Sequence, residues 1–406
     1  MNSDLSNLQP YPFERIATLK EGITPPSDLS LISLAIGEPK HPCPSIITQA
    51  ITNNLKQFEQ YPLTKGVLEL REVIAKWLEQ RFALPANSIN PEQNVLPVNG
   101  TREALFAFAQ CIVDRSVSTS TNTAKVVMPN PFYQIYEGAT ILAGAEPVYL
   151  PCTEATNYNP DYTLVPASVW QDCQLLYLCT PGNPTGGVAE LSQLKEVLAL
   201  AEKYDFVVAS DECYSELYLD ENNPPAGLLQ AAAEMGNTDY KRCVVFHSLS
   251  KRSNAPGMRS GFVAGDAAIL KQFLLYRTYH GCAMSLPIQQ ASIAAWSDEE
   301  HVKKNRLLYR QKFDAVLDIL APVMKVSRPS ASFYLWPETE VDDETFTKEI
   351  YAQQHVNVIP GSYLSRTVNG FNPGENRIRL ALVASVEECT EAAHRIKAYV
   401  EPKFLS

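Results

Sequence analysis

Short apolar runs that are rich in β-branched residues alternate with helix-like segments from residue 95 onward. The runs are VLPV (95–98), KVVMP (125–129), EPVYL (146–150), LLYLC (175–179), FVVAS (206–210), VVFHS (244–248) and GFVAG (261–265). Segments with helical periodicity, such as TREALFAFAQCIV and LSQLKEVLALAEKY, lie between many of them. Strands that alternate with helices predict an α/β fold with a mainly parallel sheet, covered by helices on both faces.

The pattern changes after about residue 285. A long helical segment, HVKKNRLLYRQKFDAVLDIL, precedes separate strand candidates in FYLW, VNVIP and RIRLALV. The proline-rich opening, through TPPSD and IGEPKHPCPS, cannot form regular helix and predicts an extended arm with turns. We therefore expect an N-terminal arm that joins a small domain (1–45), a large domain (46–284) and a small α+β domain (285–406). The low-complexity run SVSTSTNT, residues 116–123, predicts a surface loop.

Composition and charge narrow the functional class. Hydrophobic residues make up 45% and charged residues 19% of the 406 residues, as in globular proteins. The net charge of −11 argues against nucleic-acid binding. The nine cysteines are scattered without a CxxC and the six histidines form no HExxH, so we expect no metal site and a reducing compartment. Without a long apolar stretch or a secretory signal, we expect no membrane association and a cytoplasmic location.

Polar residues follow the predicted strands at their carboxyl ends, where open α/β sheets bind ligands. After VLPV, Gly100, Thr101 and Arg102 begin a helix whose N-terminus can bind an anion. A threonine that only caps the helix explains the same pattern. Tyr133, in PNPFY, can stack on a planar ligand, although core packing explains a single aromatic equally well.

The next two strands are followed by groups that suit a heteroaromatic ring. Asn183 lies in the rigid turn TPGNPTGG, which presents its amide with little loss of entropy. Asp211 ends FVVAS, where a carboxylate needs a cation or a ring N–H as its partner, unless it only caps the next helix. Tyr214 follows three residues later.

The last strand of the series leads into SLSKRSNAPGMR. Ser248, Ser250 and Arg259 suit a phosphate, and Lys251 is either a phosphate ligand or an amine nucleophile. The chain has neither GxGxxG nor GxxxxGK[ST], so the phosphate belongs to another cofactor. Phosphate ligands, a stacking face, a carboxylate for a ring nitrogen and a reactive amine together specify pyridoxal 5′-phosphate (PLP).

The ordered motifs GTRE, PNPFY, PGNPTGG, SDECYSE, SLSKRSNAPGMR and NRIRLALV resemble the PLP-dependent aminotransferases of the aspartate aminotransferase type, over essentially the whole chain. The resemblance implies a type I PLP-transferase fold with a seven-stranded sheet in the large domain. It also implies a homodimer with active sites at the subunit interface. Several short segments, such as QPYPFERI, IGEPKHP and YRTYHG, resemble the corresponding segments of the N-succinyldiaminopimelate aminotransferases of the lysine pathway.

The resemblance also assigns expected roles to the cofactor site. Lys251 resembles the Schiff-base lysine that moves the proton, and Asp211 the partner of the ring nitrogen. Asn183 and Tyr214 look like partners of the phenolic oxygen, and Tyr133 like the stacking aromatic. The implied phosphate site consists of Gly100, Thr101, Arg102 through its main-chain N–H, Ser248, Ser250, Arg259 and, from the neighbouring subunit, Tyr61 in YPLTKG.

For the substrate, the resemblance implies that Arg379 holds the α-carboxylate, near Asn183 and Gly37. Arg377 is two residues away and remains an alternative. The implied reaction is a ping-pong transfer of an amino group between N-succinyl-L,L-2,6-diaminopimelate and 2-oxoglutarate. Candidate ligands for a distal carboxylate are Lys40, Arg252 and Arg277.

Three other functions remain open at this point. The first is an aminotransferase for other amino acids, or a β-lyase, on the same scaffold. The second is a PLP-binding regulatory protein, although such regulators usually add a basic DNA-binding domain. The third is an α/β protein without a cofactor, which requires all of these placements to be coincidental.

Overall fold

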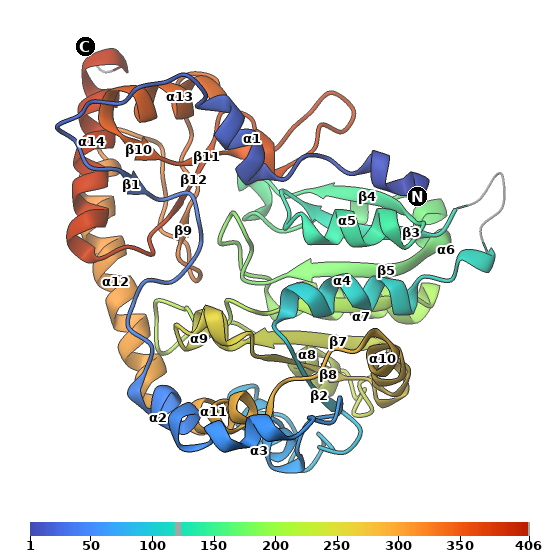
Figure 1. Ribbon diagram of the computed structural model, residues 1–406. Coiled ribbons are helices and arrows are strands. Elements are labelled where there is room, and N and C mark those ends of the chain that lie inside the picture. The colour runs from blue at the N-terminus through green and yellow to red at the C-terminus, as the bar shows by residue number, and fades with distance from the viewer. Residues whose placement is uncertain (118–122, 405–406) are drawn as a thin grey trace.

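The computed structural model describes residues 1–117 and 123–404, so residues 118–122 of the predicted loop lie outside the described residues (Figure 1). All seven predicted strands of the large sheet are present. They are β2 (Val95–Val98), β3 (Lys125–Asn130), β4 (Glu146–Pro151), β5 (Cys173–Cys179), β6 (Val207–Asp211), β7 (Cys243–Ser248) and β8 (Gly261–Gly265).

The seven strands form one sheet in the order β2-β8-β7-β6-β5-β3-β4. β8 is antiparallel to both of its neighbours, and every other neighbouring pair is parallel. The prediction of a mainly parallel seven-stranded sheet is therefore confirmed. Because the other six strands run in one direction, their carboxyl ends lie at the same edge.

Both faces of the sheet are buried, which explains why its strands are continuous apolar runs. Along β5, Leu175 and Tyr177 pack in the core of one face, whereas Leu176 and Leu178 pack in the core of the other. This alternation follows from the two-residue period of a strand. The face with Leu175 is covered by α4 (Thr101–Ile112), α5 (Ile135–Leu142) and α10 (Ala267–His280). The other core includes residues of α2 (Ser45–Asn53), α3 (Leu68–Arg81), α6 (Ala167–Asp172), α7 (Leu191–Tyr204), α8 (Leu228–Glu234) and α11 (Leu286–Trp296).

The C-terminal part has its own core and two small sheets. β9 (Tyr334–Leu335), β11 (Ile359–Pro360) and β12 (Ile378–Ala381) are antiparallel, and the helices are α12 (Glu300–Leu320), α13 (Asp343–Gln354) and α14 (Val386–Phe404). The N-terminal arm, which carries α1 (Pro12–Leu19), adds β1 (Ile32–Ser33) in parallel to β10 (Val356–Asn357). In Figure 1 this blue segment runs beside the orange and red helices.

Among the described residues, no helix has the length and apolar character needed to cross a membrane.

Candidate active site

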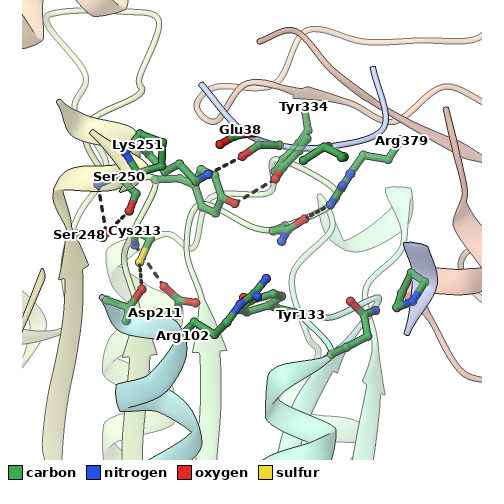
Figure 2. Close-up of a pocket in the computed structure, with 18 of the residues that line it drawn as sticks. Glu38, Arg102, Tyr133, Asp211, Cys213, Ser248, Ser250, Lys251, Tyr334 and Arg379 are labelled. Atoms are coloured by element: carbon green, nitrogen blue, oxygen red, sulfur yellow. Dashed lines mark hydrogen bonds between the residues drawn. The ribbon is translucent and has the colours of Figure 1, made fainter. Parts of the chain in front are cut away.

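A cavity of about 500 Å³ opens at the carboxyl-end edge of the large sheet. Its wall also includes residues of the C-terminal part and of the segment after β1 (Figure 2). The predicted site residues that line it are Gly37, Thr101, Arg102, Tyr133, Asn183, Asp211, Tyr214, Ser248, Ser250, Lys251, Arg259 and Arg379. Twelve positions that are scattered through the sequence therefore meet at one place.

One end of the cavity gathers hydrogen-bond donors around the start of α4. Gly100 has a φ of +83°, and a Cβ there would lie 2.1 Å from Nη2 of Arg259, so glycine lets the guanidinium approach the helix. Arg259 Nη1 lies 3.5 Å from Ser250 Oγ, and Ser248 Oγ donates to the same oxygen at 3.0 Å. The free N–H groups of the first turn, at Thr101, add partial positive charge. This end of the cavity suits a phosphate.

Lys251 lies in α9 (Leu249–Arg252), directly after β7, and its amine donates to the main-chain oxygen of Gly37. Burial lowers the pKa of the Lys251 amine to about 8, and the guanidinium groups of Arg379 and Arg259 act in the same direction. An amine with this pKa is partly neutral near pH 7 and can act as a nucleophile or a base.

Asp211 ends β6 and is buried beneath the cavity. Tyr136 Oη donates to Asp211 Oδ2 at 2.7 Å, and the main-chain N–H of Cys213 donates to Oδ1 at 3.3 Å. Burial raises the pKa of the Asp211 carboxyl, although these hydrogen bonds oppose the shift. No lysine or arginine pairs with Asp211 within the described part of the chain, so a ring N–H is a fitting partner.

Tyr133 and Arg102 lie together on the cavity wall (Figure 2). Arg102 Nε donates to Tyr133 Oη at 2.7 Å, and Arg102 Nη2 donates to Tyr11 Oη at 3.2 Å. The sequence analysis expected only the main-chain N–H of Arg102 to contribute. Its guanidinium also reaches the cavity, and no carboxylate pairs with it among residues 1–117 and 123–404.

The opposite end of the cavity is built around Arg379, which is only 5% exposed. Arg379 Nη1 donates to Asn183 Oδ1 at 2.9 Å and Nη2 donates to the main-chain oxygen of Ala35 at 2.7 Å. Its Nε is buried and finds no acceptor in the described structure. Tyr214 Oη lies 3.0 Å from Tyr334 Oη, whose ring packs 4.5 Å from the Arg379 guanidinium.

Arg377, the alternative to Arg379, lies outside this cavity. Its guanidinium pairs with Glu338 and donates to the main-chain oxygen of Trp336 at 3.1 Å. Arg377 directly precedes β12 and forms an antiparallel bridge with Glu338, and its guanidinium is engaged by the Glu338 carboxylate outside the cavity. Of the two arginines, only Arg379 is positioned to meet a ligand in the cavity.

Two predicted distal ligands are misplaced. Arg252 is buried and pairs with Glu299, and Arg277 is buried and makes two hydrogen bonds to Glu103, at 2.9 and 2.8 Å. The prediction that either binds a distal carboxylate is therefore wrong, because both guanidinium groups already hold a carboxylate of the protein. Lys40 is exposed and lies outside the cavity wall.

Tyr61 is not part of the cavity of its own chain. Its side chain is fully exposed, next to the exposed Leu63. Gly37, by contrast, lies directly at the cavity. A Cβ at Gly37 would lie 2.2 Å from Tyr334 Oη, so glycine leaves room for this tyrosine.

Several cavity residues escaped the sequence analysis. Glu38 directly follows Gly37, and Cys213 lies between Asp211 and Tyr214, so both were inside quoted motifs without being singled out. Tyr136 does not line the cavity; it is buried behind the wall, where it donates to Asp211, and no signal in the sequence identified it. Two further lining residues, Tyr11 and Tyr334, come from the N-terminal arm and from β9.

The donor set of the cavity fits PLP. Gly100 forms a cradle in which Arg259, Ser250 and the start of α4 can hold a phosphate. The buried Asp211 carboxylate suits a protonated ring nitrogen. The unpartnered Nε of Arg379 marks a place for a further acceptor, such as a substrate carboxylate.

Comparison with known proteins assigns the chain to a family of aminotransferases. Residues 30–396 match the family model of aminotransferase class I and II. A curated LL-diaminopimelate aminotransferase of Dehalococcoides mccartyi is 31% identical over 395 residues, which are 96% of each chain.

Solved structures of aminotransferases also superpose over nearly the whole chain. An aminotransferase from Neisseria meningitidis is 48% identical with a TM-score of 0.93, covering 98% of this chain and 100% of the other. A probable N-succinyldiaminopimelate aminotransferase from Thermus thermophilus is 26% identical with a TM-score of 0.80, covering 95% and 99%.

Proposed function

This chain belongs to the class I and II aminotransferases, which depend on PLP, and we propose that it transfers an amino group between N-succinyl-L,L-2,6-diaminopimelate and 2-oxoglutarate in lysine biosynthesis. The observation that carries this proposal is the presence of two arginines for carboxylates, Arg379 and Arg102, at one cavity. Both proposed substrates have an α-carboxylate and a distal carboxylate. The names of the relatives, a diaminopimelate and a probable N-succinyldiaminopimelate aminotransferase, support the same substrate class.

In the proposed site, the donors around the start of α4 would hold the phosphate, Tyr133 would stack on the ring, and Asp211 would pair with the ring nitrogen. Asn183 and Tyr214 donate to the phenolic oxygen. The proposed phosphate ligands are Gly100, Thr101, Arg102 through its N–H, Ser248, Ser250, Arg259 and the partner subunit's Tyr61. When bound, PLP supplies an electron sink for the charge that develops at the substrate Cα.

Residues of the chain itself can remove the proton from the substrate Cα. The Lys251 amine, once free, takes a proton from the substrate Cα, and its lowered pKa of about 8 makes it a competent base near neutral pH. Arg379 holds the α-carboxylate with charge-assisted hydrogen bonds and so orients the Cα–H bond toward Lys251. Asp211 keeps the ring nitrogen protonated through its buried carboxylate.

Arg102 provides a basis for selecting substrates with a second carboxylate. Tyr133 and Tyr11 hold its guanidinium in place, and a guanidinium that is held in advance loses little entropy on binding. The carboxylate of Glu38 lines the same cavity. Glu38 favours a second candidate substrate, L,L-diaminopimelate, because its carboxylate could pair with the distal ammonium of that molecule. In the succinylated substrate the distal amine is an uncharged amide.

The amino donor can be identified in a half-reaction. The purified PLP-loaded protein is mixed with N-succinyl-L,L-diaminopimelate, without an acceptor, while the visible absorbance of the bound cofactor is followed. We expect conversion to the amine form of the cofactor and release of one equivalent of keto acid. The same measurement with L,L-diaminopimelate tests the second candidate.

Three results would contradict the proposal in different ways. A response to L,L-diaminopimelate alone would move the assignment to the second candidate. Release of ammonia and pyruvate from a β-substituted amino acid, without amino transfer, would indicate a β-lyase. Binding of PLP without any turnover over a panel of amino acids would indicate a regulatory protein.

The proposal includes a division into domains and a homodimer in the cytoplasm. Residues 46–284 are proposed as the large domain, and residues 1–45 together with 285–406 as the small one, with α11 (Leu286–Trp296) packing on the core of the large domain. The pairing of β1 with β10 supports the joining of the two ends. The exposed side chains of Phe58, Tyr61 and Leu63 support an interface between subunits.

A further inference from the structure

A polar cluster next to the cavity joins His41, Asn305 and Lys312. His41 Nδ1 lies 2.9 Å from Asn305 Oδ1, and Lys312 Nζ lies 2.6 Å from His41 Nε2. His41 belongs to the segment that follows β1, whereas Asn305 and Lys312 are two turns apart on α12. The cluster therefore ties this segment to α12.

Hydrogen-bond chemistry fixes the direction of donation. A protonated lysine has only donors, so Lys312 donates to His41 Nε2. The neutral ring then carries its proton on Nδ1 and donates it to Asn305 Oδ1. Because Oδ1 accepts, Asn305 Nδ2 donates, and its acceptors are the main-chain oxygens of Lys251 and Arg252, at 3.1 and 3.3 Å.

Asn254 supports this orientation of the Asn305 amide. Asn254 Nδ2 donates to Asn305 Oδ1 at 2.9 Å, so this oxygen accepts two hydrogen bonds. A reversed amide would set its NH2 group against the donors of His41 and Asn254, and its oxygen against the carbonyl oxygens of Lys251 and Arg252. Asn305 is only 2% exposed, so water cannot replace the lost partners.

The same short segment contacts both ends of Lys251. The main-chain oxygen of Gly37 accepts from the Lys251 amine, and His41, four residues later, reaches the Lys251 carbonyl through Asn305. The segment 37–41 thus contacts the side chain directly and the main chain through one amide.

Burial and mutual repulsion favour one positive charge on the pair, with Lys312 protonated and His41 neutral near pH 7. Burial lowers the pKa of Lys312 to about 8. Burial and the charge of Lys312 also lower the pKa of His41. The other groups that face the pair are Tyr309, Lys40, Glu388 and Cys389.

We propose that His41 and Asn305 are positioning residues for Lys251: the hydrogen-bond chain that starts at Lys312 fixes the main chain from which the Lys251 amine reaches the cavity. This inference rests on the proposed role of Lys251 in proton transfer. A small displacement of a reacting group lowers the rate strongly, so the cluster acts on turnover without touching the substrate.

Four variants test the proposal in the PLP-loaded protein. Asn305→Ala removes the donors to the Lys251 carbonyl. The double variant His41→Phe/Lys312→Met removes the hydrogen bonds from Lys312 through His41 to Asn305 and leaves no buried ammonium unpaired. The phenylalanine ring at position 41 can still pack on Tyr309. His41→Gln keeps one donor and one acceptor but does not titrate. His394→Phe is the matched control, because it makes the same substitution at an exposed histidine outside the cluster.

For Asn305→Ala and for the double variant, we expect kcat to fall about 10- to 100-fold, with a smaller change in KM. The pH midpoint of the visible absorbance of the bound cofactor should shift in both. His41→Gln should retain most of kcat, and His394→Phe should behave as the unmodified protein.

The proposal is wrong if the double variant and Asn305→Ala both keep the original kcat and absorbance midpoint. It is also wrong if His41→Gln loses as much kcat as the double variant does. If the double variant does not fold, the kcat values of Asn305→Ala and His41→Gln decide whether the proposal holds. Lys251→Ala separates this outcome from a wrong role of Lys251. If Lys251 does not transfer the proton, Lys251→Ala keeps its turnover; if only the positioning proposal fails, Lys251→Ala is inactive.

Discussion

Arg379 and Asn183 are joined by a hydrogen bond of 2.9 Å, although 196 positions separate them in the chain. Arg379 comes from β12 and Asn183 from the turn after β5. The same guanidinium donates to the main-chain oxygen of Ala35 in the N-terminal arm. Three distant segments therefore share one guanidinium, and a ligand bound to Arg379 would lie where the N-terminal arm, the turn after β5 and β12 meet.

Replacing Arg379 by lysine should impair substrate binding selectively. Lysine keeps the charge but loses the paired donors, so we expect kcat/KM for the amino donor to fall roughly 10- to 100-fold. Arg377→Lys is the matched control, since that guanidinium pairs with Glu338 outside the cavity. Steady-state kinetics of both variants provide the measurement. A larger loss for Arg377→Lys would reverse the assignment.

Arg102→Gln should discriminate between substrates with one and two carboxylates. The main-chain N–H at this position is retained, so cofactor binding should persist. We expect kcat/KM for the diaminopimelate substrate to fall roughly 10-fold or more, and that for a monocarboxylic amino acid to change little. Lys40→Gln serves as control because Lys40 lies outside the cavity wall. Equal losses for both substrate types would exclude a role of Arg102 in binding the distal carboxylate.

The Lys251 amine should react at a lower pH than ordinary lysines. Its pKa is lowered to about 8, so the neutral, reactive form accumulates as the pH rises through 8. In the cofactor-free protein, labelling of Lys251 by an amine reagent should therefore have a midpoint near pH 8, as measured by mass spectrometry. Ordinary lysines should label with a midpoint near about 10.4. A midpoint at the ordinary value would show that burial does not favour the neutral amine.

Gly37→Ala should destabilise the protein mainly through its contact with Tyr334. The added Cβ would lie 2.2 Å from Tyr334 Oη, and the buried tyrosine has little freedom to move. We expect a loss of about 1–3 kcal/mol, seen as a lower Tm. Tyr334→Phe removes the clashing oxygen, so the double variant should regain part of the Tm. No recovery would mean that the strain lies elsewhere.

The sequence predicts the large sheet well because most of its strands are buried apolar runs and helices lie between many of them. The cavity residues were found for a related reason: parallel strands bring their carboxyl ends together, so Asp211 and Lys251 must be neighbours whatever the details of the loops. Asn183 and Tyr133 follow from the same rule.

The wrong predictions concern long side chains whose partners are distant in the sequence. Arg277 pairs with Glu103, 174 positions away, and Arg252 pairs with Glu299, 47 positions away. A sequence shows the charge of such an arginine but not the carboxylate that it meets in the fold. Arg102 is the opposite case, because its guanidinium has tyrosines as neighbours and remains available to a ligand.

The pairing of β1 with β10 sets the order in which the protein can mature during synthesis. Ile32 pairs with Val356, so the first strand waits for more than three hundred residues before its partner leaves the ribosome. The Gly37 contact to Lys251 and the Ala35 contact to Arg379 belong to this same arm. The large sheet can form on the nascent chain, but the carboxylate site is completed only after residue 379 has emerged. A truncated product is therefore expected to fold in part and to remain inactive.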